Sequence, residues 1–269
     1  MADHHVPLSL KEIAEIVADF VLDLFSPAKM TAAPDGATIW YRAGKCHRKD
    51  GPAMQWPDGS RKWYRNGVLH REGGPAVELS SGYREWRIKG QLHREGGPAL
   101  EYEDGVKEWY RDGLRDRLDG PAIERPDGSK EWRKEGERHR RLWPAVIEAD
   151  GTQAFFDHGL CHNEHGPAIW CADGTFGWCR HGRLHRADGP AIEWADGSKS
   201  WFRDGLCDRE DGPAVERADG TKAWFRRGRL HRADGPAVQW SDNAKEWWID
   251  GKQLTEQEFA ARQPSPRTP

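Results

Sequence analysis

The hydrophobic and polar residues of this chain repeat with a period of 23 residues. One column of the repeat is tryptophan, replaced once by Phe155; its members are Trp40, Trp63, Trp86, Trp109, Trp132, Trp178, Trp201, Trp224 and Trp247. A proline column runs from Pro52 to Pro236, and a glycine column runs from Gly44 to Gly251. A fixed period of this length is typical of repeat arrays. Residues that recur in every repeat are therefore expected to build the array, and function is expected where a repeat departs from the pattern.

Each repeat has the pattern of a β-hairpin. In the repeat that begins at Gly51, residues 53–56 and 61–65 read as short strands, and Pro57-Asp58-Gly59-Ser60 between them has turn chemistry. Asn66-Gly67 is a second turn signal. A four-residue turn at 57–60 would pair Met54 with Trp63 and place both on one face with Trp56. Arginines expected to lie on neighbouring tryptophan rings are Arg65, Arg111, Arg203 and Arg226.

The turn residues at 57–60, together with Trp63-Tyr64 and Asn66-Gly67, resemble a MORN repeat, and the likeness covers residues 34–251. His70-Arg71 and a Gly-Pro-Ala segment stand where MORN repeats usually carry His-Gly and Gly-x-Gly. In this respect the chain is similar to the variant repeats of bacterial and phage proteins, some of which are antitoxin-like. The resemblance implies an all-β fold, an extended antiparallel sheet of 23-residue hairpins.

Both ends of the chain predict helices. Residues 1–30 are expected to hold an amphipathic helix that starts at the capping box Ser9–Glu12 and runs to about Phe25. This helix would either cap the first hairpin or serve in self-association or docking of a partner. Residues 252–269 predict a short helix from Thr255 to about Arg262, followed by a disordered tail.

Composition narrows the function classes. The 15 tryptophans offset a hydrophobic content of 36% and predict a thin sheet with an aromatic stripe. A net charge of −3 makes nucleic acid a possible but less favoured partner. Five cysteines and no recognisable leader favour a reduced, cytoplasmic protein, and no apolar stretch is long enough to predict a membrane span. No catalytic constellation and no cofactor motif stand out, so we predict that the chain is not an enzyme and holds no cofactor.

The strongest departure from the repeat is the segment from Arg138 to Trp143. Most other repeats carry Asp-Gly or Gly-Gly before the proline, and here Leu142-Trp143 follows a run of basic residues. We predict that Arg138, Arg140, Arg141 and Trp143 bind a partner, because arginine and tryptophan are favoured at interaction hot spots. The alternative is a decayed repeat in which Trp143 fills a local gap.

Two further patterns contain residue types that can bind metal ions or anions. Cys161, His162, His165, Cys171, Cys179 and His181 fall in two adjacent repeats, but their spacing fits no established zinc pattern. The recurring His-Arg pair is expected to hydrogen-bond turns and neighbouring carboxylates, with anion binding as the alternative.

These observations predict a scaffold for protein–protein interaction whose partner the sequence does not name. The alternative function is binding of an anionic ligand or nucleic acid through residues 138–143.

Overall fold

From residue 28 to residue 262 the regular structure is almost entirely β. The computed structural model describes residues 9, 14, 17–18, 21 and 28–262. By its internal contacts the chain forms two compact bodies, Met1–Arg117 and Leu118–Pro269. We call them the N-terminal and C-terminal bodies and describe each by itself.

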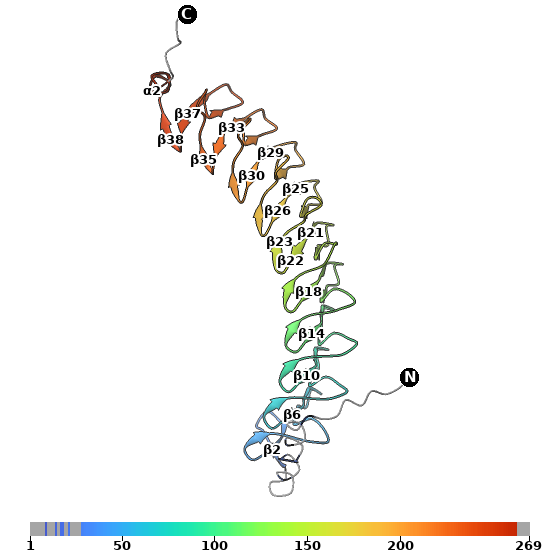
Figure 1. Ribbon diagram of the computed structural model, residues 1–269. Coiled ribbons are helices and arrows are strands. Elements are labelled where there is room, and N and C mark those ends of the chain that lie inside the picture. Colours follow the sequence, from blue (N-terminus) through green and yellow to red (C-terminus); the bar gives the residue numbers. More distant parts are fainter. Residues whose placement is uncertain (1–8, 10–13, 15–16, 19–20, 22–27, 263–269) are drawn as a thin grey trace, which may run out of the picture. The chain divides into compact units, whose positions relative to one another are not determined.

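In both bodies a large hairpin alternates with a small one (Figure 1). Large hairpins of the N-terminal body are β1 (Lys29–Ala32) with β2 (Thr38–Arg42), β4 (Met54–Gln55) with β5 (Arg61–Lys62), β8 (Val77–Glu78) with β9 (Arg84–Glu85), and β12 (Leu100–Glu101) with β13 (Lys107–Glu108). Its small hairpins are β2 with β3 (Lys45–Cys46), β6 (Tyr64–Arg65) with β7 (Val68–Leu69), β10 (Arg87–Ile88) with β11 (Gln91–Leu92), and β14 (Tyr110–Arg111) with β15 (Leu114–Arg115).

The C-terminal body continues the alternation. Its large hairpins are β16 (Ile123–Glu124) with β17 (Lys130–Glu131), β20 (Val146–Ile147) with β21 (Gln153–Ala154), β24 (Ile169–Trp170) with β25 (Phe176–Gly177), β28 (Ile192–Glu193) with β29 (Lys199–Ser200), β32 (Val215–Glu216) with β33 (Lys222–Ala223), and β36 (Val238–Gln239) with β37 (Lys245–Ile249). Its small hairpins are β18 (Arg133–Lys134) with β19 (Glu137–Arg138), β22 (Phe156–Asp157) with β23 (Leu160–Cys161), β26 (Cys179–Arg180) with β27 (Arg183–Leu184), β30 (Phe202–Arg203) with β31 (Leu206–Cys207), β34 (Phe225–Arg226) with β35 (Arg229–Leu230), and β37 with β38 (Lys252–Leu254).

Successive large hairpins pair antiparallel and form a sheet within each body. In the N-terminal body β5 pairs β8 with Lys62 opposite Val77, and in the C-terminal body β29 pairs β32 with Ser200 opposite Val215. The predicted all-β fold of repeated antiparallel hairpins is thereby confirmed.

The predicted register within a hairpin was wrong by one residue. Met54 lies opposite Lys62, not Trp63. The reason is the turn: the Gly59 amide donates to the Trp56 carbonyl at 3.1 Å, and the Trp56 amide donates to Ser60 at 2.9 Å. Gly59 has φ 92°, so the loop is a type I turn extended by one left-handed residue, and it holds three residues instead of four.

The small hairpins close with two-residue turns. In the hairpin of β6 and β7, Asn66 and Gly67 have φ 52° and 85° between the paired residues Arg65 and Val68. Left-handed values at both central residues are those of a type I′ turn, whose twist matches paired strands. Asn66-Gly67 was therefore a correct turn prediction.

The most deeply buried column of the array is alanine, not tryptophan. Ala76 is 0% exposed. Its carbonyl accepts the Trp63 amide at 2.8 Å, and its amide donates to the backbone carbonyl of Glu85 at 2.7 Å. A residue held by backbone on both sides leaves room for little more than a methyl group. The column comprises Ala53, Ala76 and Ala99 in the N-terminal body and Ala122, Ala145, Ala168, Ala191, Ala214 and Ala237 in the C-terminal body.

The two predicted terminal helices differ in outcome. Helix α2 (Glu256–Ala260) is present, and Thr255 and Glu258 form the predicted capping box. The helix predicted over residues 9–25 falls mainly on residues outside the described part of the chain. Strand β1 begins at Lys29, inside the segment 1–30 that was assigned to that helix. Among the described residues, no helix is long and apolar enough to span a membrane.

Candidate functional site

The recurring arginine, tryptophan and proline of each repeat form one contact unit, which we call the arginine staple. In the N-terminal body, the guanidinium carbon of Arg71 lies 3.7 Å from the centre of the Trp63 ring. The same side chain donates to the Pro75 carbonyl at 2.9 Å and to Glu78 at 2.8 Å. Stacking and hydrogen bonding by one guanidinium thus tie each loop to its hairpin.

The staple recurs along both bodies. Arginine–tryptophan stacking pairs are Arg48–Trp40, Arg71–Trp63, Arg94–Trp86, Arg117–Trp109, Arg140–Trp132, Arg186–Trp178, Arg209–Trp201 and Arg232–Trp224. Stacking on tryptophan was predicted, but for Arg65, Arg111, Arg203 and Arg226. For Arg111, Arg203 and Arg226 that assignment was wrong, because the loop folds back and brings the arginine eight positions after a tryptophan onto its ring.

The one repeat without tryptophan also lacks the arginine. Phe155 stands in the tryptophan column, and the staple position holds Asn163, whose side-chain amide donates to the Pro167 carbonyl at 2.9 Å. The hydrogen bond to proline is kept where the cation–ring contact is lost. The recurring residues are therefore explained by architecture.

The histidine column is also structural. Each histidine accepts, through Nδ1, the backbone amide of the turn residue in the next small hairpin; the amide of Lys89 donates to His70 at 3.0 Å, and that of Asp204 donates to His185 at 3.1 Å. Asp116 and Asp208 replace histidine in this column, and the Asp208 carboxylate accepts the Arg227 amide at 2.7 Å. This agrees with the hydrogen-bonding interpretation of the His-Arg pair.

The segment 138–143 keeps the arginine staple and loses the carboxylates that bond its arginine in other loops. Arg140 lies 3.8 Å from the Trp132 ring centre and donates to the Pro144 carbonyl at 3.3 Å. Loops 186–190 and 209–213 of the same body each bring two carboxylates to this arginine, and here Leu142 and Ile147 occupy those places. Burial without a compensating anion lowers the pKa of Arg140.

Arg138 also faces the array. Its guanidinium donates to Glu131 at 3.1 Å and lies 5.3 Å from the Phe156 ring centre. Glu131 is 4% exposed and is also bonded by Arg133. Burial alone would raise the pKa of Glu131, but the hydrogen bond from Arg138 and the two arginine charges outweigh it and lower that pKa.

The other members of the segment point to solvent. Leu142 is 73% exposed, Trp143 is 64% exposed, and Arg141 is exposed beside them. Leu118, at the position of Arg141 in the preceding loop, is 84% exposed. We call Leu118, Arg141, Leu142 and Trp143 the apolar patch. Leu118 was missed from the sequence, although its column otherwise holds glutamate, alanine, Lys49 and Arg141.

The backbone of the segment is strained at Leu142. Its φ is 66°, a value that Gly73 and Gly96 adopt at the same position of their repeats. A left-handed leucine costs about 1–2 kcal/mol. Strain of this kind persists only where the surroundings impose it, and it is common at functional sites.

Trp143 stands where regular repeats need glycine. A Cβ added to Gly189 would lie 3.0 Å from the guanidinium carbon of Arg186, and the same holds for Gly212 against Arg209. A large side chain at this position requires the altered loop described above. The tryptophan and the left-handed leucine thus belong to one local rearrangement.

The six cysteine and histidine residues of two adjacent repeats, whose spacing fitted no zinc pattern, do not converge in the structure. His162 stacks on His181 with ring centres 4.7 Å apart, and the free thiol of Cys161 shares a hydrogen bond with that of Cys179, while Cys171 lies in the turn after β24. Among the described residues, the one group of three or more metal-type ligands that lie close together contains none of the six.

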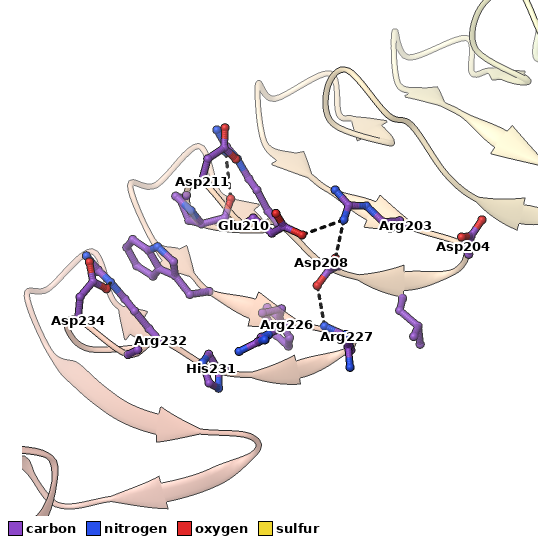
Figure 2. Close-up of a pocket in the computed structure, with 17 residues that line it drawn as sticks. Arg203, Asp204, Asp208, Glu210, Asp211, Arg226, Arg227, His231, Arg232 and Asp234 are labelled. Atoms are coloured by element: carbon purple, nitrogen blue, oxygen red, sulfur yellow. Dashed lines mark hydrogen bonds and ion pairs between the residues drawn. The ribbon is translucent and has the colours of Figure 1, made fainter. Parts of the chain in front are cut away.

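A groove of ≈1040 Å³ opens between two successive loops of the C-terminal body (Figure 2). Its charged side chains pair largely with one another: Arg203 bonds Glu210 at 3.1 Å, and Arg232 bonds Asp234 at 2.8 Å. Figure 2 shows these pairs along the loops. The groove therefore follows from the repeat geometry, and its positive and negative side chains neutralise one another.

Comparison with known proteins gives no further assignment: no family model and no curated protein matches this sequence. The resemblance to MORN repeats therefore rests on the turn and tryptophan residues quoted above.

Proposed function

We propose that this chain is a non-enzymatic repeat scaffold that binds a protein partner through the apolar patch. The observation that carries the proposal is the solvent-exposed Trp143 beside a strained Leu142, at a place where regular repeats have small or acidic residues. Exposed aromatic and aliphatic side chains next to arginine have the composition of a binding hot spot. The hairpins on either side serve as a rigid platform.

The charge of the segment indicates what kind of surface the partner would present. Arg138, Arg140 and Arg141 are close in sequence, and Leu142 and Ile147 replace the carboxylates that neutralise the arginine of a regular loop. A complementary surface would present an apolar pocket for Trp143 with an acidic rim. Arg138 and Arg140 hold the segment on the array, and Arg141 meets the rim.

Binding of an anionic ligand or nucleic acid is the second candidate, and it has less support. Two of the three arginines are engaged inside the chain, Arg138 with Glu131 and Arg140 with Trp132. A polyanion site needs several cations aimed at solvent. This candidate is kept as an outcome of the experiment below.

The resemblance extends the proposal. An array of MORN-variant type, with residues 9–25 as a second terminal helix for capping or self-association, fits a cytoplasmic antitoxin-like or phage–host interaction factor. This part rests on the resemblance and the sequence pattern alone.

The test compares three immobilised full-length chains as baits in extracts of the native cell. The first is the unmodified chain. The second carries Arg141→Ala, Leu142→Asp and Trp143→Gly, which gives this loop the sequence of the regular loop 186–190. The third carries Glu164→Ala and His165→Asp, which gives the neighbouring loop the same Ala-Asp-Gly-Pro sequence and leaves Asn163 in place.

The proposal expects a protein that the first and third chains retain and the second loses. Equal retention by all three chains would place the binding surface elsewhere. Retention that disappears after nuclease treatment and falls steeply with salt would favour the nucleic-acid candidate.

A further inference from the structure

The geometry points to a transition-metal site formed by His139, Asp157 and His158 in the C-terminal body. His139 follows β19, Asp157 ends β22, and His158 opens the turn after it. Nδ1 of His139 lies 3.0 Å from Oδ1 of Asp157, and Nε2 of His158 lies 3.8 Å from the same oxygen. One ligand atom of each residue falls within 4.8 Å of the others.

These separations suit one shared ion. Zinc–nitrogen bonds are about 2.0–2.1 Å and zinc–oxygen bonds about 2.0–2.2 Å, so ligand atoms at tetrahedral corners lie roughly 3.4 Å apart. The observed 3.0 and 3.8 Å bracket that value. Small side-chain rotations would bring all three atoms to an ion, because Asp157 and His158 are 53% and 65% exposed and free to adjust.

The repeat geometry brings the two histidines together. His139 belongs to the structural histidine column, and His158 takes the first place of a type I′ turn, with φ 42°. That conformation lays the His158 ring on His139, with centres 4.4 Å apart. The pair is thus positioned by backbone that both residues share with every other repeat.

Asp157 is the departure that converts a stacked pair into a ligand set. Its column is otherwise basic or isoleucine: Arg42, Arg65, Ile88, Arg111, Lys134, Arg180, Arg203, Arg226 and Ile249. A carboxylate here replaces a charge that would repel a cation. Arg180, the next residue of the column after Asp157, is already paired with another carboxylate: its guanidinium lies 3.0 Å from Oδ1 of Asp204.

The donor set selects the class of ion. Two imidazoles and one carboxylate suit Zn²⁺, Co²⁺, Ni²⁺ or Cu²⁺, whereas Mg²⁺ and Ca²⁺ prefer several oxygen ligands. Three protein ligands leave further positions to water. A metal on Nδ1 of His139 takes the lone pair that accepts the His158 amide at 3.3 Å, so binding should be weaker than in a closed structural zinc site.

The next repeat is a natural control. His162 and His181 are stacked in the same way, with ring centres 4.7 Å apart, but Arg180 stands in the place of Asp157. The inference therefore predicts metal at the first pair and none at the second. It does not depend on the proposed protein partner.

The experiment titrates the untagged, metal-free full-length chain with Co²⁺ and Zn²⁺, and follows calorimetric heat and the visible absorption of Co²⁺. Asp157→Asn and His158→Ala are each expected to weaken binding by about tenfold or more, which equals about 1.4 kcal/mol. His181→Ala should leave binding unchanged. Arg180→Asp should add one equivalent of bound ion by completing the second set.

Thermal melting of each metal-free variant checks that the array is intact, and these variants change only exposed side chains. Equal affinity of the parent and Asp157→Asn would overturn the inference. So would equal losses with His158→Ala and His181→Ala, because binding would then need only a stacked histidine pair. No added equivalent with Arg180→Asp would also count against it.

Discussion

Two loops of the C-terminal body, 209–213 and 140–144, begin with the same arginine staple and end with the same proline. Arg209 stacks 3.9 Å from the Trp201 ring centre and bonds Asp211 and Glu216, each at 3.0 Å. Arg140 stacks at 3.8 Å, with Leu142 and Ile147 in place of the two acids. The comparison teaches that ring stacking and the proline carbonyl build the array. The carboxylates can be exchanged for apolar side chains, one of which, Leu142, is exposed.

The largest expected effect tests the arginine staple, which the two loops share. Trp201→Ala and Trp132→Ala should each lower the free energy of unfolding by about 3 kcal/mol. Each change removes a large half-buried ring and the surface on which its arginine stacks. Urea unfolding followed by circular dichroism measures both. A Trp132→Ala chain as stable as the parent would mean that the variant repeat does not use the staple.

Removing the arginine should destabilise the chain more in loop 209–213 than in loop 140–144. Arg209→Met loses stacking and two ion pairs and should destabilise by about 1–2 kcal/mol, whereas Arg140→Met loses mainly stacking, about 0.5–1 kcal/mol. Salt sharpens the contrast. At 1 M NaCl the Arg209→Met loss should shrink, and the Arg140→Met loss should not. Equal salt dependence would show that Arg140 has a carboxylate partner in solution.

The pH dependence of stability tests the inward role of Arg138. Arg138→Met should cost about 1 kcal/mol at pH 7, because Glu131 loses one of its two arginine partners. The pKa of Glu131 is lowered in the folded chain, so its contribution is full above the unfolded value of about 4.3 and is lost as the pH falls further. Urea unfolding at pH 7 and at pH 3 should therefore show a difference between parent and variant that narrows in acid. A difference of the same size at both values would mean that Arg138 acts through packing on Phe156.

The smallest effect concerns the strained backbone. Leu142→Asn should stabilise the chain by about 0.5–1 kcal/mol, because asparagine adopts left-handed φ at lower cost and little apolar area is buried at this site. Leu118→Asn is the matched control, since Leu118 is also exposed but is not left-handed, and it should change stability little. Thermal melting compares the two. Destabilisation by Leu142→Asn would show that Leu142 packs on the chain and is not held out for a partner.

The sequence predicted the hairpins, the second turn and helix α2, because Asn66-Gly67 and the Thr255–Glu258 box carry strong local chemistry. It did not predict the register, since one left-handed glycine decides the loop length. The alanine column was overlooked because alanine gives little pattern signal, although backbone contact on both sides demands it. The stacking partner of Trp63 and the proximity of His139 to His158 arise from loops that fold back and from stacking between repeats, which spacing alone does not show.

The most direct test of the central claim, that the departure from the repeat is the binding surface, is photo-crosslinking in the native cell. A photoreactive phenylalanine analogue replaces Trp143 in one full-length chain and Gly166, at the matched position of the next loop, in another. Gly166 tolerates the change best among the matched glycines, since an added Cβ there meets only Asn163, at 3.9 Å. The account predicts one discrete, nuclease-resistant protein adduct from position 143 and none of that mass from position 166. The same adduct from both positions, or none from position 143, would contradict it.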